Sequence, residues 1–360
     1  MKNSRLKKIG WGFGLCNMNC EHCYNSSCIK DSIPRYTLGQ LIDVADKLCP
    51  HIKDINFGTG ELICNPNVVR LIHYITDTYP HIDIAVTSNG YTIVKMDLFD
   101  IKRRLSDVDI SIDFPDKDRH NAFRRHPQAW KWAIRALEIL VEIRMQRTIV
   151  MCVTSRISNH DITQMLRLAN KYGTCLRLSW YRNVGRGVKE LRVSAERAWQ
   201  IIEFLSDKAV FSCLDSVFAG PLGVKSNQCP GARFSARIHQ DMNVTAYPFL
   251  QGQQWSAGNI LHPEVDLVKV YNSDAFVRIR NRKVPLCENC KFAESCAGGC
   301  ITRAILHSGG LNEIDDYCPV RFGQMHLVER VRKNIVMHKQ GNLVHEGYLC
   351  TTILRPHPDV

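Results

Sequence analysis

A regular alternation of short β-branched runs with longer segments of helical period constrains this chain more than any other feature. Runs typical of strands lie at residues 9–13, 54–57, 83–87, 108–112, 148–153 and 176–180. Segments such as 41–48, 129–143 and 195–205 are typical of amphipathic helices. Because strands that alternate with helices form a parallel sheet, we predict an α/β fold with a partial (β/α)6 TIM-like barrel. Its chemistry is expected where strands end and loops begin.

Beyond about residue 210 the alternation gives way to a loop-rich, cysteine-bearing region. We therefore predict a barrel over 1–210, a small cysteine-rich domain over 211–325, and a C-terminal helix and tail over 326–360. Within this part we expect a closing helix at 322–337 and a frayed tail at 355–360. Neither a membrane-spanning apolar run nor a secretory leader is visible, so we expect a soluble, cytoplasmic protein with no membrane partner.

The cysteine content and the net charge limit the classes of function that this chain can have. In a chain of this length with no leader, 16 cysteines favour metal ligands over a disulfide framework. The net charge of +12 suggests an acidic partner, whether nucleic acid, acidic peptide or anionic cofactor, and does not choose among them.

The first cysteine cluster follows the first predicted strand, with Cys16, Cys20 and Cys23 in a Cys-x3-Cys-x2-Cys pattern. A structural zinc ion takes four protein ligands, whereas three thiolates on a cubane leave one iron open to an outside ligand. The pattern therefore indicates a reactive iron–sulfur site. The alternative is a zinc knuckle in which His22 or Cys28 completes the tetrahedron.

In this position the pattern resembles the radical S-adenosylmethionine (radical SAM) superfamily. Gly58-Thr59-Gly60-Glu61, after the second strand, is similar to the family's Gly-Gly-Glu segment, although Thr59 replaces a glycine. The resemblance implies that Glu61 binds the methionyl ammonium group. Two later segments, Thr87-Ser88-Asn89-Gly90 and Ser111-Ile112-Asp113, are similar to stretches that line the cofactor in this family. His120-x3-Arg124 also resembles a pattern of the family. The resemblance implies cofactor contacts for Ser88, Asn89, Ser111, Asp113 and Arg124.

Each segment alone has an ordinary structural explanation, since Glu61 could cap a helix, Asn89 could start a turn and Asp113 could be a solvated carboxylate. Their order at successive strand ends favours the family interpretation. The resemblance implies a 4Fe-4S cluster whose open iron binds S-adenosylmethionine. One electron, from a donor such as flavodoxin or ferredoxin, would cleave the cofactor to methionine and a 5'-deoxyadenosyl radical that takes a hydrogen atom from a substrate.

The end of the sixth strand carries further candidates. Trp180, Tyr181 and Arg182 lie where a substrate would approach. Gly185-Arg186-Gly187 resembles a Gly-Arg segment that seats polar groups in these barrels, and the alternative is a surface turn. We interpret Cys152, inside a strand, as a small core residue.

The second cysteine cluster reads Cys287-x2-Cys290-x5-Cys296-x3-Cys300-x17-Cys318. A zinc ribbon is the alternative, but behind such a barrel the spacing resembles the SPASM extension, which holds auxiliary iron–sulfur clusters. The resemblance implies an outer 4Fe-4S cluster on Cys287, Cys290, Cys296 and Cys318, hence at least one auxiliary cluster.

The same resemblance implies that an inner auxiliary cluster would need Cys229, Cys300 and a further cysteine where this chain has Tyr247. Cys213 is an alternative upstream ligand. Because the ligand set is incomplete, we predict fewer than three clusters.

These observations favour an enzyme that modifies a ribosomally made peptide by crosslinking, epimerisation or excision. The alternative substrate is a small molecule, a carbohydrate or amino-acid derivative, that is oxidised or epimerised. Since the first strand starts near residue 9, leader recognition would need a separate protein or direct docking to basic surface. The non-enzymatic alternative is a zinc-stapled nucleic-acid-binding protein, which we do not favour.

Overall fold

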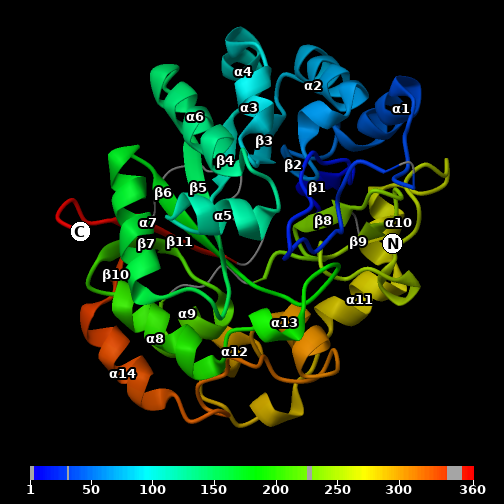
Figure 1. The fold of residues 1–360 in the computed structure, drawn as a ribbon. Helices are drawn as coiled ribbons and strands as arrows, with labels where there is room; N and C mark the ends of the chain where they lie inside the picture. Colours follow the sequence, from blue (N-terminus) through cyan, green and yellow to red (C-terminus); the bar gives the residue numbers. More distant parts are fainter. Residues whose placement is uncertain (1–3, 31, 225–228, 339–350) are drawn as a thin grey trace.

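The structure is a computed structural model that describes residues 4–30, 32–224, 229–338 and 351–360. Its described residues form one eleven-stranded sheet in the order β10-β7-β11-β6-β5-β4-β3-β2-β1-β8-β9 (Figure 1). The central strands are parallel and follow chain order, and they are β1 (Lys8–Gly12), β2 (Asp54–Thr59), β3 (Asp83–Ser88), β4 (Asp107–Ser111), β5 (Arg147–Val153) and β6 (Cys175–Trp180). The predicted strands and the partial barrel are therefore confirmed.

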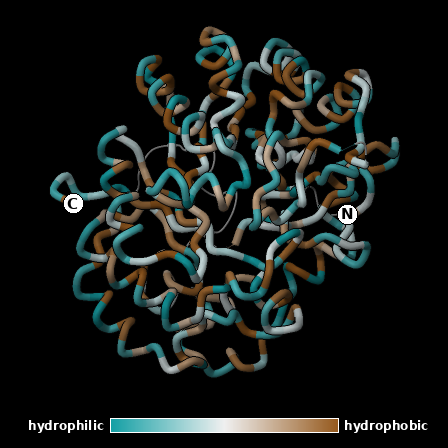
Figure 2. Tube along the Cα trace, in the orientation of Figure 1, coloured by the Kyte–Doolittle hydropathy of each residue, from teal (hydrophilic) through white to brown (hydrophobic). Residues whose placement is uncertain are grey.

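Helices connect the parallel strands and cover the outside of the sheet (Figure 1). They are α1 (Leu38–Leu48), α2 (Pro66–Thr78), α3 (Tyr91–Lys95), α4 (Leu98–Arg104), α5 (Lys117–Arg124), α6 (Ala129–Glu142), α7 (Asn159–Lys171) and α8 (Ala195–Leu205). Apolar and hydrophilic stretches alternate along them in Figure 2. In α1 the buried residues Leu41, Val44, Ala45 and Leu48 share one face, so the helical period in the sequence marks the side that packs on the sheet.

The C-terminal part extends the same sheet at both ends. β8 (Ser235–Ile238) pairs in parallel with β1, and β9 (Val244–Thr245) pairs with β8. At the other end β11 (Thr352–Pro356) lies antiparallel between β6 and β7 (Ala209–Cys213), and β10 (Val336–Met337) pairs with β7. The helices of this part are α9 (Ser216–Leu222), α10 (Leu267–Asn272), α11 (Asp274–Arg280), α12 (Ala293–Cys296), α13 (Ile301–His307) and α14 (Met325–Asn334).

Two details of the predicted C-terminus are wrong. Residues 355 and 356 belong to β11 and are not frayed, because this strand has pairing partners on both sides and buries Ile353 and Leu354. The closing helix α14 is shorter than the predicted 322–337. The domain division at residue 210 stays a prediction, and β7 crosses it.

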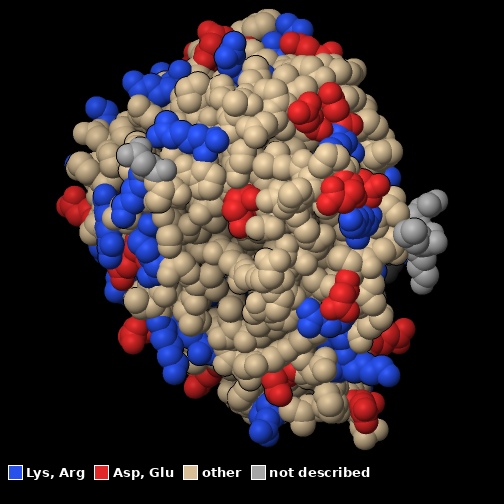
Figure 3. Space-filling view, turned by 90° about the vertical axis from the view of Figure 1, so that its right-hand side faces the viewer, with Lys and Arg blue, Asp and Glu red and all other residues tan. Residues whose placement is uncertain are grey.

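The described helices include none that is long and apolar enough to cross a membrane. On the face shown in Figure 3, Lys and Arg side chains gather toward the left edge, and the middle carries few charges. The positive surplus is therefore unevenly spread on this face.

Candidate active site

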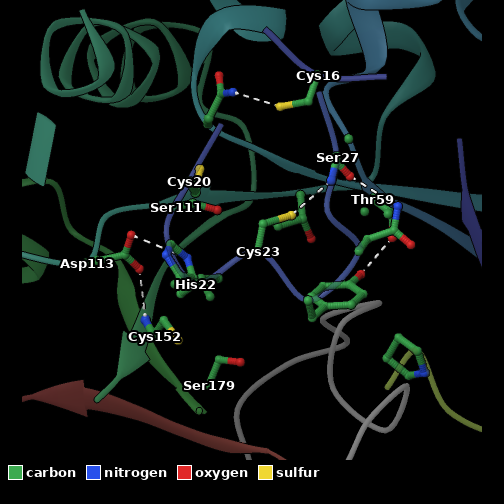
Figure 4. A pocket seen from close by; sticks show the side chains of 18 of the residues that line it. Cys16, Cys20, His22, Cys23, Ser27, Thr59, Ser111, Asp113, Cys152 and Ser179 are labelled. Carbon is green, nitrogen blue, oxygen red and sulfur yellow. Dashed lines mark hydrogen bonds and ion pairs between the residues drawn. The ribbon is translucent and has the colours of Figure 1, made fainter. Parts of the chain in front are cut away.

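The loop after β1 brings the three N-terminal cysteines to one cavity with about 1210 Å³ of open space (Figure 4). Cys16 and Cys20 are buried, and Cys23 is half-buried. Backbone N–H groups point at two of the sulfur atoms, from Met18 to Cys16 Sγ at 3.5 Å and from Ser27 to Cys23 Sγ at 3.3 Å. Such bonds stabilise sulfur ligands of iron–sulfur clusters, so the donor set fits a cluster.

The thiols of Cys16 and Cys20 are poor nucleophiles without a metal centre. Burial raises the pKa of Cys16 well above its usual value and that of Cys20 to about 11. A bound metal centre would be needed to hold them as thiolates. Within the described part of the chain, no group of three or more His, Cys, Asp or Glu side chains is arranged to hold a single metal ion.

Glu61 lies beside the cysteine loop, fully buried between β2 and α3. Gly60 has a φ of +82°, and a Cβ there would lie 2.3 Å from the Leu15 carbonyl oxygen, so only glycine allows the two loops to approach. The Glu61 N–H then donates to that oxygen at 2.7 Å. Its carboxylate accepts hydrogen bonds from Ser88 Oγ (2.5 Å) and the Thr92 N–H (2.7 Å) on Oε1 and from the Asn89 N–H (2.9 Å) on Oε2, and the Thr92 side chain also hydrogen-bonds to it.

The carboxylate of Asp113 anchors the opposite wall. Arg124 Nε donates to its Oδ2 at 2.8 Å, and the Cys152 N–H donates to its Oδ1 at 3.1 Å. Burial raises the pKa of Asp113, but the guanidinium of Arg124, together with His22 and His120, outweighs burial and brings the pKa to about 2. His22, which stacks on Phe123 with ring centroids 4.3 Å apart, is kept neutral because burial lowers its pKa to about 4. The pair Asp113–Arg124 is thus ionised and fixed in the cavity wall.

The structure places every residue predicted for the first site around this one cavity. These are Cys16, Cys20, Cys23, Glu61, Ser88, Asn89, Ser111, Asp113 and Arg124. Asn89 Nδ2 lies 3.8 Å from Cys16 Sγ and 2.9 Å from Asn17 Oδ1, which links β3 to the cysteine loop. The individual roles of these residues stay predictions.

Arg186 is a functional candidate whose position the sequence did not reveal. Its N–H donates to the Cys23 carbonyl at 3.0 Å, its Nε to the Cys20 carbonyl at 3.0 Å and its Nη2 to the Ser27 carbonyl at 2.9 Å. Gly185 has a φ of +66°, and a Cβ there would lie 2.4 Å from a carbonyl oxygen of the cysteine loop. The segment after β6 therefore holds the cysteine loop closed and is more than a surface turn.

Other lining residues were not predicted as site residues from the sequence. Arg177 on β6, Arg237 on β8 and Phe249 beyond β9 all face this cavity. The contribution of Arg237 depends on the pairing of β8 with β1, two strands far apart in sequence.

The four cysteines predicted for an outer cluster, Cys287, Cys290, Cys296 and Cys318, line a second cavity of about 770 Å³. Burial raises the pKa of Cys296 to about 12, so this thiol too would need a metal centre to ionise. The shared cavity is consistent with a common cluster, which stays a prediction.

The two remaining candidates, Cys229 and Cys300, line a third cavity together with Tyr247. Cys229 Sγ lies 3.1 Å from Tyr247 Oη. Cys300 Sγ lies 3.2 Å from Arg182 Nη2 and 3.0 Å from Thr302 Oγ1. The alternative ligand Cys213 is not among the residues that line this cavity, and its thiol donates to a backbone carbonyl at 3.1 Å.

Comparison with known proteins agrees with this geometry. Residues 13–169 match the model of the radical SAM superfamily. The mycofactocin maturase MftC of Mycobacterium tuberculosis is 27% identical over 95% of this chain and 90% of its own length. In fold the chain is similar to anSMEcpe with bound AdoMet, with a TM-score of 0.69 and 16% identity over 95% of this chain and 98% of that one. It is also similar to Streptococcus suis SuiB bound to the precursor peptide SuiA, with a TM-score of 0.67 and 13% identity over 88% of this chain and 76% of that one.

Residues 13–169 are therefore a radical SAM domain, and the protein is an enzyme. The radical SAM superfamily uses a 4Fe-4S cluster and S-adenosylmethionine. The non-enzymatic alternative of a zinc-stapled nucleic-acid-binding protein is wrong.

Proposed function

We propose that this enzyme cleaves S-adenosylmethionine at a cluster held by Cys16, Cys20 and Cys23 and modifies a ribosomally made peptide. The main support for this proposal is that all nine residues predicted for the first site line one cavity and fall inside the segment that matches the radical SAM superfamily. Strand ends from β1 to β4 contribute to the site, as expected for a parallel barrel.

When bound, the cluster and its cofactor would supply a 5'-deoxyadenosyl radical able to abstract hydrogen from an unactivated C–H bond. The chain's own part is binding and orientation. Glu61 would accept a hydrogen bond from the methionyl ammonium group in addition to its protein donors. Arg124 uses Nε for Asp113, and its terminal nitrogens would remain for the methionyl carboxylate. The buried walls would exclude water and competing hydrogen donors.

The C-terminal part is proposed to be a SPASM-type domain with at least one auxiliary 4Fe-4S cluster. Support comes from the common cavity of Cys287, Cys290, Cys296 and Cys318. An inner cluster on Cys229 and Cys300 is not expected, because Tyr247 stands where a third thiolate would be needed and two thiolates rarely hold a cubane.

The peptide substrate rests on the relatives. A maturase of Mycobacterium tuberculosis is similar in sequence over most of this chain. SuiB, which has a similar fold, has been solved with its precursor peptide. An electron donor such as flavodoxin or ferredoxin and a separate leader-recognition protein complete the proposed partners. Oxidation or epimerisation of a small molecule is the alternative.

The test uses anaerobically reconstituted protein with a chemical reductant and, as substrates, the products of any small open reading frames beside the gene. We expect 5'-deoxyadenosine and a mass change in the peptide. Replacing Cys16, Cys20 and Cys23 together by Ala should abolish both products and leave the auxiliary iron in place. Undiminished 5'-deoxyadenosine in this variant would overturn the assignment of the cluster. Product from a small molecule, with an unaltered peptide, would favour the alternative substrate.

A further inference from the structure

Arg182 is a buried cation held rigidly at the end of β6. The residue is only 7% exposed, and its side chain donates from Nε to Thr302 Oγ1 (2.7 Å), from Nη1 to the Trp180 carbonyl (2.7 Å) and from Nη2 to Cys300 Sγ (3.2 Å). The guanidinium also lies over the Phe249 ring, 4.5 Å from its centroid. These contacts fix its position and leave it little freedom to reach solvent.

This cation has no carboxylate partner within ion-pair distance among the described residues, unlike the buried arginines around it. Three other buried arginines each have a carboxylate partner: Arg124 pairs with Asp113 at 2.8 Å, Arg177 with Asp109, and Arg303 with Asp315 at 2.7 Å. Buried charges are normally paired, because leaving one uncompensated is costly. An anion from outside the chain would complete the site.

Arg182 lies beside the space that a substrate would occupy. It lines both the cavity of the three-cysteine loop and the cavity of Cys229 and Cys300. The residues common to both linings are Arg177, Ser179, Trp180, Arg182 and Phe249. A molecule that extends from the reacting centre toward Cys300 therefore passes this guanidinium.

We propose that Arg182 binds a carboxylate of the substrate and so sets which residue of the peptide faces the reacting centre. A guanidinium has five N–H donors, of which Arg182 uses three, so one remains on each terminal nitrogen. Two such donors match the paired oxygens of a carboxylate. The carboxylate can come from the peptide's C-terminus or from an Asp or Glu side chain. This inference rests on the proposed peptide function and deepens it.

The experiment measures binding to the full chain loaded with iron, sulfide and S-adenosylmethionine. The peptide probes are acetyl-Gly-Ala-Phe-Ala-Gly as free acid, the same peptide as C-terminal amide, and an amide in which Glu replaces the last Ala. The small probes are 3-phenylpropionate and 3-phenylpropanamide. Affinities are taken from titration calorimetry, or from saturation-transfer NMR for millimolar binders.

We expect the carboxylate forms to bind about tenfold or more tightly than the amides, as for one charge-assisted pair. Arg182→Gln should abolish this preference, and Arg182→Lys should retain part of it because the charge remains and the fork is lost. Arg167→Gln, on the exposed side of α7, makes the same change in net charge away from both cavities and should keep the preference. A preference for the free acid identifies the C-terminus as the source, and a preference for the Glu peptide identifies a side chain.

Equal binding of acid and amide peptides to the parent protein would overturn the inference and leave the peptide function standing. If only 3-phenylpropionate shows the Arg182-dependent preference and no peptide binds, the carboxylate site stands and the peptide function fails. Absence of binding by every probe overturns the site. Loss of iron in Arg182→Gln, with no acid preference in the parent, would instead assign Arg182 to holding Cys300 as a thiolate and would also overturn the inference.

Discussion

Replacing Glu61 by Gln separates two roles considered for this carboxylate, support of the start of α3 and binding of the methionyl ammonium group. Oε1 already accepts from Ser88 and Thr92, and Oε2 accepts from Asn89. The Thr92 side chain also hydrogen-bonds to this carboxylate, so the ammonium group would share one of its about four acceptor positions with a protein donor. The amide of a glutamine at this position offers one accepting oxygen and a donating NH2 group, so one protein donor loses its acceptor.

The expected magnitude follows from this count. A buried donor left without an acceptor costs about 1–3 kcal/mol, so the free energy of unfolding should fall by that amount. Loss of one charge-assisted hydrogen bond to the ammonium group should weaken S-adenosylmethionine binding by about 1–3 kcal/mol, roughly five- to 150-fold.

Denaturant unfolding and calorimetric titration of the reconstituted protein measure the two effects separately, and iron analysis should show unchanged cluster content. The matched control is Asp97→Ala, which removes the acceptor of the Phe99 N–H (2.9 Å) and the Asp100 N–H (3.3 Å) at the start of α4, outside the cavity. It should lower stability and leave cofactor affinity unchanged. If Glu61→Gln lowers stability alone, Glu61 only supports α3. If neither quantity changes, the hydrogen-bond count itself is refuted.

Three further predictions follow from the buried and crowded contacts. Asp113→Asn should lower the free energy of unfolding by about 3–5 kcal/mol, because it leaves Arg124 buried without its carboxylate; a denaturant titration showing almost no change would contradict the ionised pair. Gly185→Ala should release iron from the three-cysteine site, since the new Cβ would collide with carbonyl oxygens of the cysteine loop, and full iron retention would count against this latch. Iron and sulfide analysis should give about two clusters per chain. Cys229→Ala and Cys300→Ala should leave the Mössbauer spectrum of the outer cluster intact. A count of three clusters in the parent protein, or a loss of about four irons in either variant, would refute the prediction that no inner cluster forms.

Local patterns predicted the parts of this protein that depend on neighbours in the chain. Short β-branched runs marked the six parallel strands, which are buried on both faces, and a period of 3.6 in apolar residues marked several helices, which are buried on one face. The three-cysteine spacing and the polar residues at strand ends were readable for the same reason. Parallel strands bring their carboxyl ends to one edge, so Glu61, Asn89 and Asp113 share a cavity although each follows a different strand.

Tertiary structure alone decided the contacts between distant segments. β11 enters the sheet between β6 and β7, although its residues carried no strand signal strong enough to be predicted. Arg186 closes the cysteine loop, and Arg182 meets Cys300, across 118 residues of sequence. Such pairings depend on which surfaces the folded sheet brings together. The local pattern of apolar residues does not predict where a single buried side chain points or which residue it contacts. The sequence by itself thus determined the class of chemistry, and the tertiary structure decided which charges surround it.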